Sequence, residues 1–343
     1  MRVRNEVPAM IGLRRYISAA MVAIVPVAIV PWSGFATVAR ADASAVTVPA
    51  WVYPLNSSST SHQTPAQPDR PLAVPGSVLT YTAAQLGDLF SAPGWFPESH
   101  SAMPKIVAQG RRPDVYACGY CHTPGGQGRP ENASLAGLPA QYILQQVADF
   151  KSGSRRSAGP DTFLPFGLMT QVAVHATESE VATAAAYFAR QHLRSRVRVI
   201  ERDRVPRSRV VGWVYTAVPP GDEPLGERLM EFAPDAARHE HRDDAMQYLA
   251  YVPVGSVRRG RGIALSAAHP ALPCVGCHGQ LLQGAGLVPR LAGRSPTYLL
   301  RQLLAFKTGT RAGAGAAPMQ AVTANMTLAE MIDVVAYAAS LKP

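Results

Sequence analysis

The sequence lacks a long uninterrupted hydrophobic run. Its most apolar stretch, residues 17–30, is shorter than the roughly 20 residues that cross a membrane, and Pro26 interrupts it. Arg14 and Arg15 precede this stretch and small residues follow it up to Ala41, an order typical of a cleaved secretory signal. We therefore predict that residues 1–41 are a signal peptide and that the protein is exported to the periplasm. A signal that stays uncleaved and anchors the chain in the membrane is the alternative.

The chain also lacks clusters of basic and aromatic side chains. It carries 33 Lys+Arg against 23 Asp+Glu, a formal net charge of +10. Removal of the signal peptide would take away five of these basic residues and one acidic residue, so the mature protein is less basic. Nucleic acid is therefore not an expected partner.

Cysteine is scarce, and its placement is informative. The four cysteines all fall in two motifs, Cys118-Gly-Tyr-Cys-His122 and Cys274-Val-Gly-Cys-His278. A C-x-x-C-H run is typical of covalent haem attachment, because both thiols on one helical turn reach one porphyrin. A redox disulfide would need no histidine, and a zinc knuckle would need both pairs on one metal.

The motifs therefore predict two covalently attached haem c groups. In each motif two thiols would hold the porphyrin and the histidine would bind the iron. The predicted attachment residues are Cys118, Cys121, Cys274 and Cys277, and the predicted iron ligands are His122 and His278.

The two motifs belong to a longer internal repeat. In both halves a tyrosine lies 24 residues after the first cysteine, and residues 142–153 match residues 298–309 position by position. Their apolar spacing predicts an amphipathic helix that ends at a glycine. A second helix closes each half, and its capping box begins at Thr177 in the first half and at Thr327 in the second.

At 343 residues the length also favours two domains. We predict a mainly α fold of two tandem domains with a β-containing insertion between them. After the signal peptide we expect a flexible Pro/Ser-rich arm, a first domain, a β-rich insertion that rests on the second domain, and that second domain. The boundaries are 42–77, 78–195, 196–254 and 255–343. We interpret residues 51–53 of the arm as part of an undocked linker, and docking of these residues on a neighbouring part is the alternative.

The repeat also predicts the second iron ligand. Met169 and Met319 each lie eight residues before the capping threonine of their half. A methionine thioether opposite histidine is a common pair in electron-transfer haems. Met326 and Met331 are expected to be packing residues. His175 remains an alternative ligand in the first half.

These motifs resemble class I cytochrome c domains, and the pair resembles the dihaem cytochrome c4 family. The resemblance covers residues 105–192 and 255–341, and it implies that each haem packs between the helices of its domain. In that family a proline carbonyl orients the proximal imidazole. Pro289 matches it, whereas Ala133 stands in the first half, so we expect this hydrogen bond to be missing at His122.

We interpret the protein as a carrier of single electrons between redox proteins, a donor and an acceptor of which one could be a membrane-bound oxidase or dehydrogenase. Two closed Met/His sites favour transfer over catalysis. The alternatives are a dihaem enzyme, such as a cytochrome c peroxidase or thiosulfate dehydrogenase, or the cytochrome subunit of a periplasmic dehydrogenase. Glu98 and Asp114 are acid–base candidates for the enzyme, but neither has an identifiable partner.

The two haems are expected to differ in potential. The loop before Met169 is six residues longer than its counterpart and carries Phe163 and Phe166, which could cover the first haem edge. Together with the missing hydrogen bond, this predicts the higher potential for the haem on Cys118 and Cys121.

Overall fold

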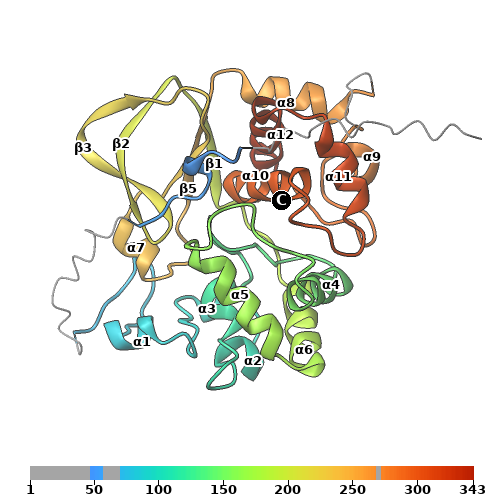
Figure 1. Ribbon diagram of the computed structural model, residues 1–343. Coiled ribbons are helices and arrows are strands. Elements are labelled where there is room, and N and C mark those ends of the chain that lie inside the picture. Colours follow the sequence, from blue (N-terminus) through green and yellow to red (C-terminus); the bar gives the residue numbers. More distant parts are fainter. Residues whose placement is uncertain (1–46, 57–69, 268–271) are drawn as a thin grey trace, which may run out of the picture. The chain divides into compact units, whose positions relative to one another are not determined.

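The computed structural model describes residues 47–56, 70–267 and 272–343, which form helices and one sheet (Figure 1). The predicted signal peptide lies outside the described residues, as do residues 57–69 of the predicted arm. The predicted combination of helices with a β-sheet is confirmed. No helix in the described ranges is long and apolar enough to cross a membrane.

The first helical group has a main hydrophobic core, to which Ile143, Ala185 and Phe188 contribute, while Leu86 belongs to a smaller separate core. Its helices are α1 (Ala83–Gly87), α2 (Lys105–Ala108), α3 (Cys118–His122), α4 (Ala140–Lys151), α5 (Leu164–His175) and α6 (Glu178–Ala189). Helix α4 packs against α5 and α6. The predicted capping box starts α6, because the Thr177 side chain accepts from the Glu180 amide while the Glu180 carboxylate accepts from the Thr177 amide.

The second helical group repeats this plan. It contains α8 (Ser256–Leu265), α9 (Val275–His278), α10 (Pro296–Lys307), α11 (Ala317–Ala324) and α12 (Leu328–Ser340). Helix α12, which begins at the predicted capping box, packs on α8 and α10. Gly260 permits the close approach of α8, since a methyl group there would overlap the carbonyl oxygen of Asp333.

A five-stranded sheet separates the two groups along the chain. Its strands are β1 (Val197–Glu201), β2 (Arg204–Val211), β3 (Val214–Pro224), β4 (Met230–Phe232) and β5 (Tyr248–Val252), in the order β1-β5-β4-β3-β2. The pairs β1–β5 and β3–β4 are parallel, and the other two are antiparallel. Helix α7 (Ala236–Glu240) lies between β4 and β5. The predicted β-rich character of this segment is therefore confirmed.

The insertion contacts both helical groups, although we expected it to rest on the second. Strand β1 packs on α12, and β4 packs on α10. On the side of the first group, the Trp95 indole donates to the His241 carbonyl at 2.7 Å, and the buried Arg196 donates to the Gly128 carbonyl at 2.9 Å. The insertion thus bridges the two groups, an arrangement that local strand propensity could not indicate.

Part of the predicted flexible arm is packed. The short 3₁₀ helix η1 (Ala50–Val52) is followed by Tyr53, whose side chain is 5% exposed. The Tyr53 ring meets Phe163 edge-on at 5.2 Å, and Arg301 donates to the Val52 carbonyl at 2.8 Å. The interpretation of this segment as undocked is wrong, because the parts of the chain around Phe163 and Arg301 pack against it.

Candidate functional site

Each C-x-x-C-H motif forms one helical turn. The first is α3, and the second is α9 with Cys274 as its N-cap residue. None of the four cysteines is joined to another by a disulfide in the structure. The backbone turns to positive φ directly after each histidine, +62° at Thr123 and +80° at Gly279, which ends the helix. Both thiols and the imidazole of each motif therefore lie on a single turn, as attachment of one porphyrin requires.

The two motif histidines are held in the same way. His122 donates from Nδ1 to the Ala133 carbonyl at 2.8 Å, and His278 donates to the Pro289 carbonyl at 2.8 Å. Burial lowers the pKa of both imidazoles, although these hydrogen bonds oppose the shift. Each ring is therefore neutral with Nε2 available to a metal, the form in which histidine binds iron.

The expectation that His122 lacks this hydrogen bond is wrong. The bond needs a carbonyl oxygen in the right place, which every residue has, and the loop supplies one at Ala133 without proline. The loop of residues 133–136 is kept close to His122 because Gly126 and Gly128, both at positive φ, pack against its backbone.

The predicted methionine ligands lie on equivalent helices. Met169 is in α5 and Met319 is in α11, and both side chains are partly buried. Met326 and Met331, by contrast, are 2% and 0% exposed in the core of the second group, as expected for packing residues. His175 is exposed, and its ring bonds the Gln171 carbonyl one turn earlier in the same helix.

The two acid–base candidates occupy separate surface turns. Glu98 is exposed in the 3₁₀ helix η3 (Pro97–Ser99). Asp114 lies in a turn that a bridge between Arg111 and Val115 closes. Neither carboxyl contacts the two motifs among the described interactions.

Matching residues of the two repeats meet in a network that we call the seam. It consists of Tyr142, Gln146 and Arg155 from the first repeat and Tyr298, Gln302 and Arg311 from the second. Arg155 donates to the Tyr298 hydroxyl at 2.9 Å, and Arg311 donates to the Tyr142 hydroxyl at 2.9 Å. The backbones of the two arginines form a β-bridge. Each repeat therefore completes the hydrogen bonding of the other.

The seam is strongly positive. Burial alone would raise the pKa of Tyr142, but the adjacent guanidinium groups of Arg311 and Arg155 outweigh it and lower that pKa. Buried Arg294 adds a third positive charge beside this phenol. None of the ion pairs among the described residues includes these three arginines. The cluster therefore suits a ligand that carries carboxylates.

The surroundings of the two motifs differ. In the first, the residues between the cysteines, Gly119 and Tyr120, are buried. In the second, Gly276 and Cys277 are exposed. Three exposed leucines flank this second motif, namely Leu272, Leu281 and Leu287, at 65%, 60% and 55% exposure. The first motif is thus covered by other parts of the chain, whereas the second reaches the surface.

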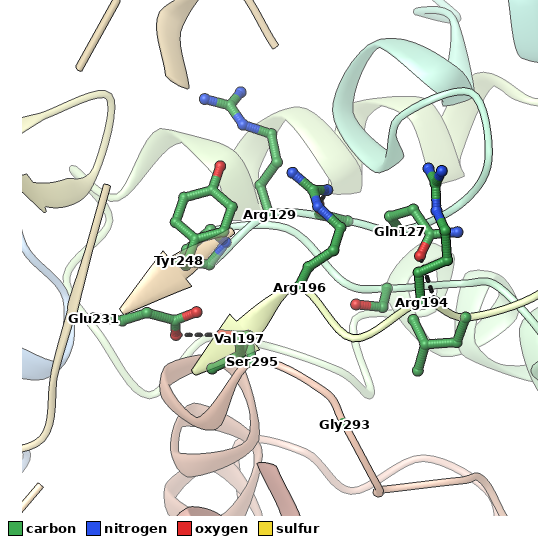
Figure 2. A pocket seen from close by; sticks show the side chains of 13 residues that line it. Gln127, Arg129, Arg194, Arg196, Val197, Glu231, Tyr248, Gly293 and Ser295 are labelled. Atoms are coloured by element: carbon green, nitrogen blue, oxygen red, sulfur yellow. Dashed lines mark hydrogen bonds between the residues drawn. The ribbon is translucent and has the colours of Figure 1, made fainter. Parts of the chain in front are cut away.

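A polar cavity lies where the sheet meets both helical groups. Figure 2 shows Arg129, Arg196, Tyr248 and Glu231 around it, with Glu231 bonded to Ser295. Its volume of about 10 Å³ is at most that of one water molecule, so it cannot hold a substrate. Burial raises the pKa of Glu231 to about 6, while its hydrogen bonds with Ser295 and the α10 N-terminus oppose the shift.

Sequence reasoning missed the arginines near the first motif. Examples are Arg129, which is buried, and Arg242, which is half-buried; both lie beside the Cys121 thiol closely enough to lower its pKa, although burial of the thiol raises that pKa more. The repeat could not indicate them: the counterpart of Arg129 is Ala285, and Arg242 belongs to the insertion, which has no counterpart. An arginine in a sequence gives no local sign that it will be buried.

Residues 262–342 match the family described as cytochrome c. Cytochrome c-554(548) of Halomonas halodenitrificans is 38% identical over 68 residues, which is 20% of this chain and 82% of that protein. Cytochrome c-552 of Acidithiobacillus ferridurans is 46% identical over 68 residues, which is 20% of this chain but only 28% of that protein.

Longer relatives align with both halves. The thiosulfate dehydrogenase electron acceptor of Thiomonas intermedia is 27% identical over 250 residues, which is 72% of this chain and 83% of that protein. Cytochrome c4 of Azotobacter vinelandii is 26% identical over 220 residues, which is 63% of this chain and 79% of that protein. The resemblance to cytochrome c4 inferred from the motifs is therefore confirmed.

Proposed function

Because the chain belongs to the cytochrome c family, we propose that it is an exported dihaem cytochrome that carries single electrons between redox proteins. The observation that carries this proposal is the equivalence of the two motif histidines, each with Nδ1 bonded to a carbonyl at 2.8 Å. Two motif histidines that are oriented by the same hydrogen bond suit an electron carrier with two haem centres. Haem c, when bound, supplies an iron that alternates between ferrous and ferric states.

We assign the cofactor-holding residues as the motifs predict. Cys118 and Cys121 would hold one porphyrin, and Cys274 and Cys277 the other. The neutral imidazoles of the two histidines would bind iron from one side. The positive charge of the seam fits the carboxylates of the porphyrin and would hold them between the two repeats.

Met169 and Met319 are the proposed second iron ligands. Their equivalent places on α5 and α11 support this, as does the exposed position of the alternative, His175. With histidine and methionine on either side, neither iron would have an open position for substrate. We therefore favour transfer over catalysis. We also propose the periplasm as its location and 78–195 and 255–343 as the two cytochrome domains.

Haem quantitation tests the proposal. The purified protein should contain two haems that stay with the denatured polypeptide in acidified organic solvent, because thioether bonds survive unfolding. Cys118→Ala with Cys121→Ala should halve the haem content. Cys274→Ala with Cys277→Ala is the matched variant and should halve it as well. Haem that is extracted from the denatured wild type would contradict covalent attachment.

A more specific role is suggested by one relative, whose name describes an electron acceptor of thiosulfate dehydrogenase and which aligns with 72% of this chain. We propose a sulfur-oxidising dehydrogenase as a candidate donor. The oxidised protein should then be reduced by thiosulfate only when such a dehydrogenase is added. Reduction by thiosulfate alone, with turnover, would instead favour the alternative in which this chain is itself the enzyme.

A further inference from the structure

The insertion places an arginine on the first haem motif. The guanidinium carbon of Arg242 lies 3.5 Å from the centre of the Tyr120 ring, and Tyr120 stands between the two motif cysteines. Nη1 of Arg242 also donates to the Tyr120 carbonyl at 3.2 Å. A residue from outside the repeat therefore contacts both the ring and the backbone carbonyl of Tyr120 in the attachment turn.

The loop that presents Arg242 is held on several sides. The Arg242 amide donates to the His239 carbonyl at 3.1 Å, and the carbonyl of His239 also accepts from Arg129 at 2.8 Å. The neighbouring Asp243 is paired with Arg238 at 2.6 Å. The Trp95 indole donates to the carbonyl of His241, the residue directly before Arg242. The guanidinium group is therefore fixed rather than free to move into solvent.

The charge of Arg242 is not neutralised. No carboxylate in the described part of the chain lies within ion-pair distance of it, and its buried Nε has no hydrogen-bond partner there. Nearby Arg129 is paired with Glu131 at 3.0 Å. Since Arg129 and Glu131 largely cancel each other, Arg242 leaves an excess positive charge beside the motif.

We propose that Arg242 raises the reduction potential of the haem attached to Cys118 and Cys121 above that of the second haem. This inference rests on the proposed function. Oxidation of an iron centre adds one positive charge, and a fixed positive charge in a poorly solvated site opposes that addition. The reduced state of the first site is therefore favoured.

The second motif has no equivalent of this arrangement. The residue aligned with Tyr120 is Gly276, which is exposed, and a methyl group built on it would meet no atom within 4 Å. Water screens charges around an exposed turn far better than around a buried one. Arg242 of the insertion thus gives a cause for the higher potential predicted for the first haem. The hydrogen bond of His122, which was expected to be missing, is present and does not explain it.

Two substitutions separate charge from packing. Arg242→Gln keeps an amide that can donate to the Tyr120 carbonyl but removes the charge, whereas Arg242→Lys keeps the charge. Arg209→Gln, at an exposed position of β2 in the same insertion, is the control for loss of one positive charge at a solvated place. The full-length protein with both haems is titrated potentiometrically, and the methionine methyl resonances of each haem follow its oxidation state.

With Arg242→Gln the midpoint potential of the first haem should fall by about 59 mV, which corresponds to a tenfold smaller equilibrium constant for a one-electron reduction. The second haem should not shift. Arg242→Lys should retain most of the wild-type value, and Arg209→Gln all of it. Two haems with unchanged potentials in Arg242→Gln, or a shift confined to the second haem, would refute the role of Arg242 and leave the proposed function intact.

If Arg242→Gln fails to bind haem, a second variant still tests the proposal. Glu131→Gln removes a negative charge from the same buried cluster with little change of shape, and it should raise the potential of the first haem. A lower or unchanged potential in this variant would overturn the electrostatic account. Absence of covalent haem from the wild type would instead refute the proposed function itself.

Discussion

At the scale of single residues, hydrogen-bond geometry and not residue type decides how the two haem-motif histidines are oriented. Ala133 and Pro289 differ in side chain, yet their carbonyls bond His122 and His278 at the same 2.8 Å. Differences between the two sites therefore arise from residues beyond the motif histidines and their hydrogen-bond partners. Arg242 beside the first motif and the exposed Gly276 in the second are the clearest of them.

The proposed methionine ligands give a prediction at this scale. Met169→Ala should remove one of two sets of strongly shifted methionine methyl resonances, and Met319→Ala should remove the other, because each thioether would bind one iron. The near-infrared sulfur-to-iron band should lose about half its intensity each time. Met326→Leu, a change in the buried core, is the control and should leave both sets in place. If His175→Asn removes a set while Met169→Ala does not, the ligand of the first haem is misassigned.

At the scale of elements, the crossing of α8 and α12 rests on one glycine. Gly260→Ala should lower the free energy of unfolding by about 2 kcal/mol or more, because the added methyl would push against the α12 backbone at Asp333. Denaturant titration measures the loss.

Gly262→Ala is the matched control in the same helix. A methyl group there meets nothing within 4 Å, so the change should be neutral or stabilise the protein by about 0.5–1 kcal/mol through helix propensity. Equal effects of the two substitutions would show that α8 does not cross α12 as closely as described.

At the scale of the whole described chain, the seam and the insertion tie the two helical groups together. Arg155 and Arg311 exchange hydrogen bonds with the tyrosine of the opposite repeat, and Phe163 of the first group belongs to the core of the second. Since each group completes the polar and apolar contacts of the other, we expect the two to unfold together.

Calorimetry tests this coupling. The wild type should show one thermal transition, and the double variant Arg155→Met with Arg311→Met should show two, because each half-buried tyrosine and glutamine of the seam loses its partner from the other repeat. Arg261→Met, at an exposed position of α8, should unfold as the wild type does. A single transition in the double variant would mean that the insertion and the arm, rather than the seam, join the two groups.

The sequence by itself was sufficient for the features that repeat or that follow local rules. The two motif turns, the helices after Tyr142 and Tyr298, and the capping boxes at Thr177 and Thr327 all lie where predicted. The physical reason is that capping and helical periodicity depend on residues within a few positions of one another.

Only the tertiary structure decided the features that depend on distant contacts. It places Tyr53 in a groove with Phe163 and Arg301, and it brings Arg242 onto Tyr120, which precedes it by 122 positions. Burial of an arginine or a tyrosine is set by what the rest of the chain packs around it, and that environment has no local signature in the sequence. The internal repeat therefore predicted how the two C-x-x-C-H motifs are alike, and the packing of unrepeated segments decided how they differ.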